Sequence, residues 1–226
     1  MSELHSSRTI FVVRNEVDAS ANFHCEALVS LLPDPIEIDL PTGERFDLGE
    51  ADAVVLTGST AGVYEADEHP WMYEEMELIR TLVDRRIPTL GVCFGHQLVN
   101  AALGGSVEQI GLTATLLEAE LEDIALFDGV SPVLPTVHED AVVTRGDEMD
   151  VIATAPHNPV FATRHQQAPL WTVQFHPEFD ATHRDELIGS FGWESDTYSF
   201  SDVSSKVLFD NFLALVDNHP VPSHPG

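Results

Sequence analysis

Short apolar runs alternate with helical patterns over the first half of the chain. Runs rich in β-branched and apolar residues predict buried strands at 9–16, 52–56 and 87–92. Residues 35–40, PIEIDL, alternate apolar and acidic positions, which is typical of a half-exposed edge strand. Strands that alternate with helices at this spacing favour a parallel sheet covered by helices on both faces.

Helical spacing of apolar residues predicts four helices between and after these strands. They are expected at 22–32, 70–86, 94–103 and 206–217. Asn22 is a candidate N-cap for the first of them. The last helix is amphipathic and is expected to pack back on the sheet.

The pattern changes after Gly111, where short strands joined by turns replace the helices. Strands are expected at 113–122, 123–127, 136–144, 150–156, 159–165 and 170–176. They suggest an antiparallel extension of the sheet and not a separate domain. Residues 180–205 are rich in Gly, Ser and Asp and predict mobile loops or short helices.

Length and composition indicate the size of the hydrophobic core and the cellular compartment of the protein. The 226 residues are 43% hydrophobic, which is enough for a sizeable core and excludes a disordered chain. No run of about 18 apolar residues and no signal peptide is present, so we expect a soluble, cytoplasmic protein. The two cysteines, Cys25 and Cys93, are expected to be separate thiols, in agreement with a reducing compartment.

The formal charge of −28 excludes several kinds of partner. There are 38 acidic residues against 10 basic ones, and Lys206 is the single lysine. Such a field disfavours nucleic acid and anionic membranes. The acids are scattered, as in proteins of salt-in halophiles, where high ionic strength screens the self-repulsion. This points to a habitat and leaves the chemistry open.

The candidate chemistry begins at a nucleophile elbow, a tight strand-to-helix turn that exposes one side chain. The strand at 87–92 runs into Cys93-Phe94-Gly95 and then into a helix. The amides that follow Cys93 lie at a helix N-terminus, where free N–H groups and the helix dipole favour a thiolate or an oxyanion. The alternative is a buried structural cysteine in an ordinary strand–loop–helix.

A histidine at the end of a later strand supplies a candidate base. His176 follows the apolar run LWTVQF, and Pro177 prevents the strand from continuing. Glu178 is close enough for its carboxylate to turn back to the imidazole and fix its tautomer. A thiol, a base and a group that orients the base are what acyl transfer requires.

These residues together resemble a known family. Gly91-Val-Cys93-Phe-Gly95-His-Gln97, Phe175-His-Pro-Glu178 and an upstream Thr57-Gly-Ser59 loop are similar to the class I (triad-type) glutamine amidotransferases, in particular to the amidotransferase component of GMP synthase. The resemblance covers about residues 8–178. It implies a three-layer, flavodoxin-like α/β fold with a mostly parallel sheet and an antiparallel extension. We expect one domain over 1–226, in which 179–226 form irregular loops and the final helix.

The resemblance also implies roles for the residues of the triad. Cys93 would attack the side-chain amide of L-glutamine and form a γ-glutamyl thioester. His176 would act as the base and then protonate the leaving ammonia, and Glu178 would orient His176. Ammonia would then pass to a synthetase partner.

Further roles follow for the residues around the triad. The Phe94 N–H would be one oxyanion donor, and the second would come from the Gly58-Ser59 backbone. Gln97 matches the position that contacts the substrate. The loop His138-Glu139-Asp140 resembles the one that receives the amino-acid end of glutamine.

Two positions depart from the family pattern. The upstream loop has Gly58-Ser59-Thr60 where the family commonly has Gly-Gly-Pro. Serine adopts positive φ only at a cost, which predicts an oxyanion hole that is shaped differently or forms only on activation. Glu139 stands where many relatives have Gly, and it brings a charge near the zwitterionic substrate.

The sequence has no motif for metal binding or for ATP-dependent ligation. Acidic pairs such as Glu74-Glu75 and Asp147-Glu148 are expected to be solvated, and no His or Cys partners at ligand spacing point to a metal. No phosphate-binding G-x-x-x-x-G-K-[ST] loop is present, so ATP-dependent ligation is not encoded, and no cofactor is expected.

Three functions stay open at this point. The first is a glutaminase that delivers ammonia to an acceptor enzyme. The second is a γ-glutamyl peptidase or hydrolase, which would use the same triad on a larger leaving group. The third is a catalytically silent regulatory module, which has no need for all three of Cys93, His176 and Glu178.

Overall fold

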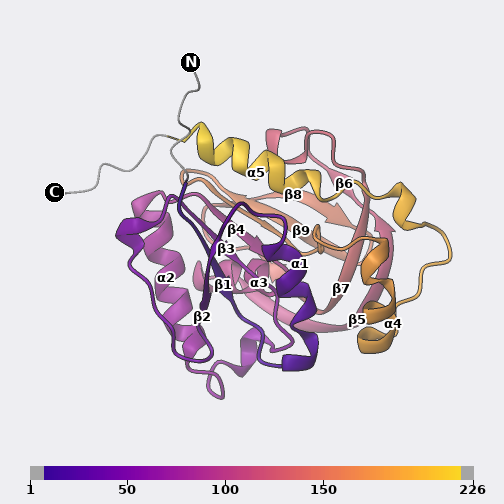
Figure 1. Cartoon of the computed structure of the whole chain (residues 1–226), viewed down its shortest axis with the longest axis horizontal. Helices are drawn as coiled ribbons and strands as arrows, with labels where there is room; N and C mark the ends of the chain where they lie inside the picture. The colour runs from indigo at the N-terminus through magenta and orange to yellow at the C-terminus, as the bar shows by residue number, and fades with distance from the viewer. Residues whose placement is uncertain (1–7, 220–226) are drawn as a thin grey trace.

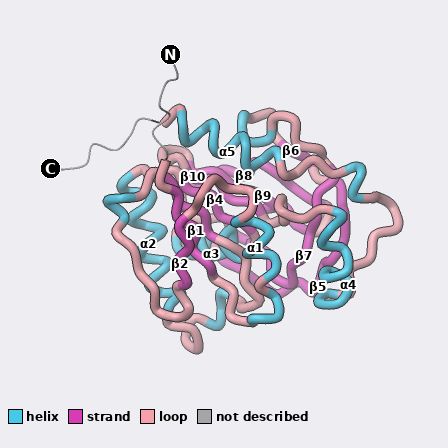
Figure 2. The backbone as a smooth tube through the Cα atoms, in the orientation of Figure 1, coloured by secondary structure: helices cyan, strands magenta, loops and turns pink. Residues whose placement is uncertain are grey.

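The computed structural model describes residues 8–219, and an eight-stranded sheet forms its centre (Figures 1 and 2). The strand order is β2-β1-β3-β4-β10-β9-β8-β6. The strands are β1 Ile10–Arg14, β2 Ile36–Asp39, β3 Ala53–Leu56, β4 Thr89–Val92, β6 Glu120–Leu121, β8 Met149–Ala155, β9 Asn158–His165 and β10 Leu170–Val173. From β2 to β10 the pairs are parallel, and from β10 to β6 they are antiparallel. The expected parallel sheet with an antiparallel extension is confirmed.

Helices cover both faces of this sheet. They are α1 Phe23–Val29, α2 Trp71–Arg85, α3 Phe94–Ala102 and α5 Val207–Asp217, whereas α4 Arg184–Phe191 packs in a third apolar cluster with Leu116 and Val133. Alternate residues of β1 and β3 point to opposite faces. One set packs with α1 and α5, and the other packs with α2 and α3. The three-layer α/β architecture follows from these two apolar clusters.

A second, two-stranded sheet departs from the expectation for the middle of the chain. It pairs β5 Ser106–Glu118 with β7 Val133–Thr144 in antiparallel register. Most of the predicted strands at 113–122 and 136–144 therefore lie outside the main sheet, and only β6 joins it. The sequence pattern identifies strands, but which strands pair depends on contacts far apart in the chain.

Two local predictions are wrong. Residues 123–127 do not form a strand, because Leu126 and Phe127 enter the core from the 3₁₀ helix Ala125–Phe127. Asn22 does not cap α1 with its side chain, which instead accepts a hydrogen bond from Arg14 at 3.3 Å.

The irregular region after residue 180 contains short helices, as expected. These are α4 and the 3₁₀ helices Ala181–His183 and Phe200–Asp202. Three other 3₁₀ helices lie earlier in the chain, at Ala19–Ala21, Leu48–Glu50 and Val63–Glu65.

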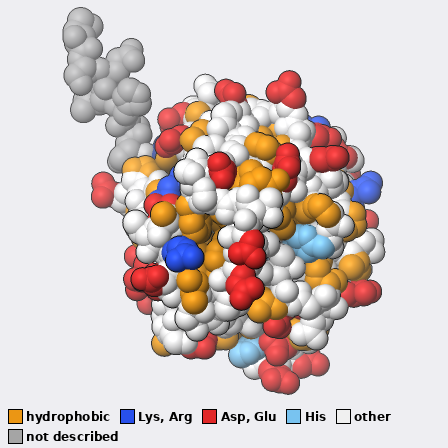
Figure 3. All heavy atoms as spheres, turned by 90° about the vertical axis from the view of Figure 1, so that its right-hand side faces the viewer, with side chains coloured by type: hydrophobic (Ala, Val, Ile, Leu, Met, Phe, Trp, Pro, Cys, Tyr) orange, Lys and Arg blue, Asp and Glu red, His pale blue; other side chains and the backbone are white. Residues whose placement is uncertain are grey.

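The surface reflects the acidic composition. Figure 3 shows Asp and Glu side chains spread over one whole face, with few Lys or Arg among them. High ionic strength screens the mutual repulsion of such dispersed like charges. Adaptation to a salt-rich cytoplasm stays a prediction. Within residues 8–219, no helix is both long enough and apolar enough to cross a bilayer.

Glu75 is an exception to this solvated surface, contrary to expectation. Its side chain is fully buried in α2 and accepts a hydrogen bond from Asn15 Nδ2 at 3.0 Å. Its Oε2 atom has no protein partner. Burial raises the pKa of Glu75 to about 8, although the Asn15 bond lowers it. The carboxyl group is therefore neutral at pH 7.

We expect Glu75→Gln to change how stability depends on pH. In the wild type, Glu75 lowers the free energy of unfolding by up to about 1.4 kcal/mol per pH unit between pH 4.5 and about 8. The reason is that the Glu75 carboxyl group releases its proton in this range only in the unfolded state. The glutamine variant lacks this loss. The free energy of unfolding of Glu75→Gln, relative to that of the wild type, should therefore increase from pH 4.5 to about 8. Urea titrations at a series of pH values measure this difference.

Glu74→Gln is the matched control, because Glu74 is exposed on the same helix. An advantage of Glu75→Gln that is constant from pH 4.5 to 8 would contradict a neutral, buried Glu75.

Candidate active site

The elbow at Cys93 has the strained geometry that the sequence predicts. Cys93 lies between β4 and α3 with φ 52° and ψ −104°. Its N–H donates to the Val173 carbonyl at 2.8 Å, which ties the turn to β10. A Cβ atom on Gly95 would lie 2.6 Å from the Leu56 carbonyl oxygen. Only glycine therefore allows α3 to begin this close to β3.

The Cys93 sulfur lies between two groups from other elements. It is 3.6 Å from the Val137 carbonyl oxygen of β7 and 3.7 Å from Nε2 of Gln174. Only 6% of the residue is exposed. The adjacent Phe94 N–H is the first of α3 and has no acceptor within the helix. It can therefore donate to an anion that forms at Cys93.

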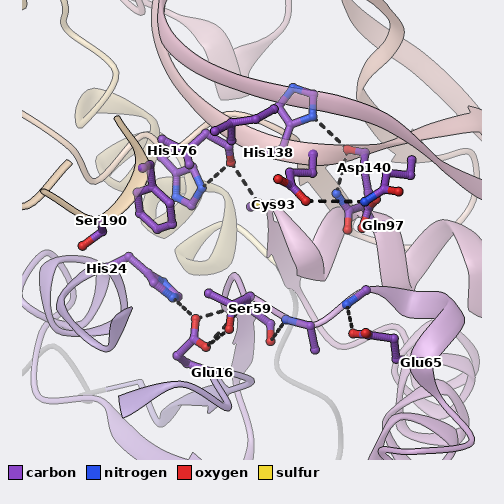
Figure 4. A pocket seen from close by; sticks show the side chains of 18 of the residues that line it. Glu16, His24, Ser59, Glu65, Cys93, Gln97, His138, Asp140, His176 and Ser190 are labelled. Carbon is purple, nitrogen blue, oxygen red and sulfur yellow. Dashed lines mark hydrogen bonds and ion pairs between the residues drawn. The ribbon is translucent and has the colours of Figure 1, made fainter. Parts of the chain in front are cut away.

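His176 and Glu178 reach the same point from the end of β10. Nδ1 of His176 lies 2.6 Å from Glu178 Oε1, and its Nε2 lies 3.2 Å from the Val137 carbonyl oxygen (Figure 4). Cys93 and His176 thus contact the same carbonyl oxygen. Phe179 stacks on the imidazole, with 4.6 Å between ring centroids.

The surroundings of His176 favour its charged form. Burial lowers its pKa, but the Glu178 carboxylate and the Cys93 sulfur outweigh that effect and raise the pKa of His176 well above its usual range. Both ring nitrogens then carry protons, which they donate to Glu178 and to Val137. An imidazolium beside a cysteine stabilises the reactive thiolate.

The Gly58-Ser59 loop lies on the opposite side of the cavity. Neither Gly58 nor Ser59 has a positive φ. The strain expected from serine at this position is therefore absent, and the departure from Gly-Gly-Pro costs the backbone nothing. A Cβ on Gly58 would lie 3.4 Å from Cε1 of His176, so the loop backbone approaches the imidazole closely.

One cavity of about 520 Å³ reaches the thiol, the imidazole and the Ser59 loop. Its lining also includes the four residues expected to bind substrate, namely Gln97, His138, Glu139 and Asp140. In Figure 4, Gln97 and Asp140 lie on one side of Cys93, and His176, His24 and Ser190 lie on the other. The structure therefore brings every predicted site residue to this region of the fold.

His138, Glu139 and Asp140 lie within strand β7 and not in a loop, and side-chain hydrogen bonds fix this part of the strand. Nε2 of Gln97 donates to the Asp140 carbonyl at 3.0 Å, and Nδ1 of His138 donates to the same oxygen at 2.8 Å. Glu139 is exposed at the rim. Burial, with the charge of Glu139, raises the pKa of Asp140 despite the Tyr64 hydroxyl 3.5 Å away. No Lys or Arg belongs to the described lining, so this end is acidic and suits an ammonium group.

Several residues of the site were not predicted from the sequence. Gln174 had a signal, because it lies two positions before His176 and strand residues two apart share a face. His24, Glu16 and the Val137 carbonyl had none, since they come from unrelated elements. Between residues 8 and 219, no group of three or more His, Cys, Asp or Glu side chains could hold a metal ion.

Comparison with known proteins places the chain in a family. Residues 12–193 match the family Glutamine amidotransferase class-I. The chain therefore belongs to the class I glutamine amidotransferases.

Several curated relatives carry the name GMP synthase. A glutamine-hydrolysing GMP synthase subunit from Methanothermobacter thermautotrophicus is 38% identical over 106 residues, which are 45% of this chain and 57% of that protein. The equivalent subunit from Methanopyrus kandleri is 32% identical over 66% of this chain and 78% of that protein. The GMP synthase of Caldanaerobacter subterraneus is 30% identical over 77% of this chain, and the match spans only 32% of that longer protein.

Solved structures support the fold. A glutamine amidotransferase from Thermotoga maritima superposes with a TM-score of 0.75 over 94% of this chain and 100% of that one, at 19% identity. A putative GMP synthase subunit from Thermoplasma acidophilum gives 0.68 over 94% and 96%, at 18% identity. At these identities the likeness concerns the architecture alone.

The charge state of the site leads to a prediction about thiol reactivity. Glu178→Gln removes the carboxylate that raises the pKa of His176, so the charged imidazolium beside Cys93 is disfavoured. We expect iodoacetamide labelling of Cys93 at pH 7 to slow by about tenfold, which corresponds to a loss of about 1.4 kcal/mol of stabilisation by the neighbouring cation. Peptide mapping by mass spectrometry measures the rate, and the fully buried Cys25 serves as the internal reference.

Glu194→Gln, at an exposed position, is the control and should label at the wild-type rate. Equal rates for Glu178→Gln and wild type would show that Glu178 does not influence the thiol.

Proposed function

We propose that this protein is a glutaminase that hydrolyses L-glutamine to glutamate and ammonia. The single observation that carries the proposal is the arrangement at Val137. Cys93 Sγ and His176 Nε2 lie 3.6 and 3.2 Å from one carbonyl oxygen, and Glu178 lies 2.6 Å from the other ring nitrogen. Family membership supports glutamine as the substrate.

The chemistry divides into acylation and hydrolysis. The Cys93 thiolate attacks the γ-amide carbon, and the carbonyl oxygen becomes an oxyanion that accepts from the Phe94 N–H and from the loop backbone at Ser59. As the C–N bond breaks, His176 gives its proton to the leaving nitrogen, and ammonia departs. A water molecule then loses a proton to His176 and attacks the thioester, which releases glutamate and restores the thiolate.

The acidic end of the cavity orients the substrate. We propose that Asp140 and Glu139 face the α-ammonium group, while the α-carboxylate binds backbone N–H groups, since no Lys or Arg belongs to the described lining. Gln97 donates to the Asp140 carbonyl at 3.0 Å and so positions this part of β7 as well. Glu139 then adds a favourable charge where many family members have Gly.

The ammonia acceptor is proposed to be a separate synthetase chain. Two of the relatives are named as single subunits of GMP synthase, which implies a second chain, and they match over 57% and 78% of their lengths. The longer GMP synthases match over about a third of theirs. By this analogy, the present chain supplies ammonia to a partner with the acceptor site, of the kind that makes GMP.

A γ-glutamyl peptidase is the second candidate, and one observation favours it. The cavity continues past His176 to Ser190 and Phe191 on α4, which leaves room for a leaving group larger than ammonia. Comparing kcat/KM for glutamine and γ-glutamyl dipeptides separates the two functions. Preference for the dipeptides, with or without a synthetase, would support the peptidase.

We expect Cys93→Ala to abolish glutamate release from glutamine, because alanine has no nucleophilic atom with which to form the acyl intermediate. Coupled detection of glutamate measures the rate. Circular dichroism and calorimetric titration with glutamine should show a folded protein that still binds its substrate. Turnover at the wild-type rate in this variant would refute the proposed nucleophile.

A further inference from the structure

A second buried histidine–carboxylate pair lies in the wall of the same cavity. Glu16, just after β1, is 8% exposed, and its Oε2 lies 2.7 Å from Nε2 of His24 on α1. Both residues line the cavity (Figure 4). The reaction proposed above uses neither of them.

Glu16 bonds directly to the Gly58–Thr60 loop, which is proposed to supply the second oxyanion donor. Its carboxylate accepts from the Thr60 N–H at 3.1 Å and also from the Thr60 hydroxyl. The N–H groups of Val17 and Asp18 donate to the same carboxylate at 2.8 Å. One side chain thus fixes the residue that directly follows Ser59. The many donors lower the pKa of Glu16 although burial raises it.

His24 supports the loop from behind. A Cβ on Gly58 would lie 3.3 Å from Cε1 of His24 and 3.4 Å from Cε1 of His176, so the Gly58 backbone lies against both rings. The ring centroids are 6.1 Å apart. Burial lowers the pKa of His24, but Cys25 and Glu16 outweigh it and raise that pKa to about 9. The ring is therefore a cation that balances Glu16.

The other end of the loop is fixed independently. The Thr57 carbonyl accepts from the Gly95 N–H at 3.1 Å, at the start of α3, and from Asn15 Nδ2 at 3.3 Å. Gly58 and Ser59 are the two residues between this anchor and the Glu16 contact at Thr60. The two anchors restrain the backbone of these residues, and within the loop the Ser59 hydroxyl also accepts from the Ala61 N–H at 3.1 Å.

We propose that Glu16 and His24 are positioning residues that hold the Gly58–Thr60 backbone in the shape of an oxyanion hole. This rests on the proposed glutaminase reaction. Donors fixed in advance stabilise a developing oxyanion without reorganisation, whereas a loose loop loses that benefit.

Direct proton transfer to the substrate is not the role of His24. Its Nε2 bonds Glu16, and its Nδ1 lies 3.6 Å from the Cys25 sulfur, so neither ring nitrogen is free. A buried ion pair also costs desolvation and contributes little to stability by itself. Its position against the loop is what gives the pair a function.

Glu16→Gln tests the proposal, because it keeps the shape of the side chain and removes the charge and one acceptor. We expect kcat for glutamine to fall about 100-fold, comparable to the loss of one oxyanion donor, with KM within about threefold of wild type. Iodoacetamide labelling of Cys93 should stay within about threefold, since alkylation forms no oxyanion. His24→Gln should behave in the same way.

Thr60→Val is the second variant, to be used if Glu16→Gln fails to fold. Thr60 is exposed, so the substitution is compatible with folding, and it removes the hydroxyl that donates to Glu16. We expect a lower kcat for Thr60→Val, at an unchanged labelling rate, and recovery in Thr60→Ser.

Unchanged kcat in both Glu16→Gln and Thr60→Val would overturn the proposal. So would a labelling rate that falls in parallel with kcat, since the pair would then act through the thiol and not through the loop. A wild-type chain that releases no glutamate, alone or with a synthetase, would instead refute the proposed function.

Discussion

The left-handed backbone at Cys93 is the constraint on which the site depends. A residue with φ 52° and ψ −104° costs on the order of 1–3 kcal/mol and persists only where its surroundings over-determine it. Here β4 is buried on both faces, the Cys93 N–H is bonded to Val173, and Gly95 lets α3 approach β3. The strain places the sulfur in the cavity and the Phe94 N–H beside it. A relaxed turn would separate the two.

Two histidine–glutamate pairs lie in the cavity wall, and both imidazole rings contact Gly58. His176 with Glu178 faces the sulfur, and His24 with Glu16 faces the loop. Both imidazoles have raised pKa values despite burial, because Glu178 and Cys93 act on His176 and Cys25 and Glu16 act on His24. In a protein of net charge −28, these buried cations are matched locally, so the reactive region does not rely on the surface field. The acidic rim at Glu139 and Asp140 is a separate feature that suits an ammonium group.

Much of this could be predicted from the sequence, where the signal is local. Apolar periodicity predicted β1, β3, β4 and the helices α2, α3 and α5, and the turn at Cys93 followed from a strand that ends at small residues. Non-local contacts could not be predicted. Glu75 has the same local surroundings as Glu74, yet only Glu75 meets Asn15 in the interior. The pairing of β5 with β7 and the contact of Glu16 with Thr60 likewise join distant segments.

Trapping the acyl intermediate shows whether Cys93 carries a γ-glutamyl group during turnover. The wild-type protein is mixed with glutamine, quenched in acid within the first turnovers, and digested for peptide mass spectrometry. We expect the mass increase of one γ-glutamyl group on the peptide that contains Cys93, and we expect this adduct to disappear as glutamine is consumed. Steady release of glutamate without any such adduct, or an adduct on Cys25, would contradict it.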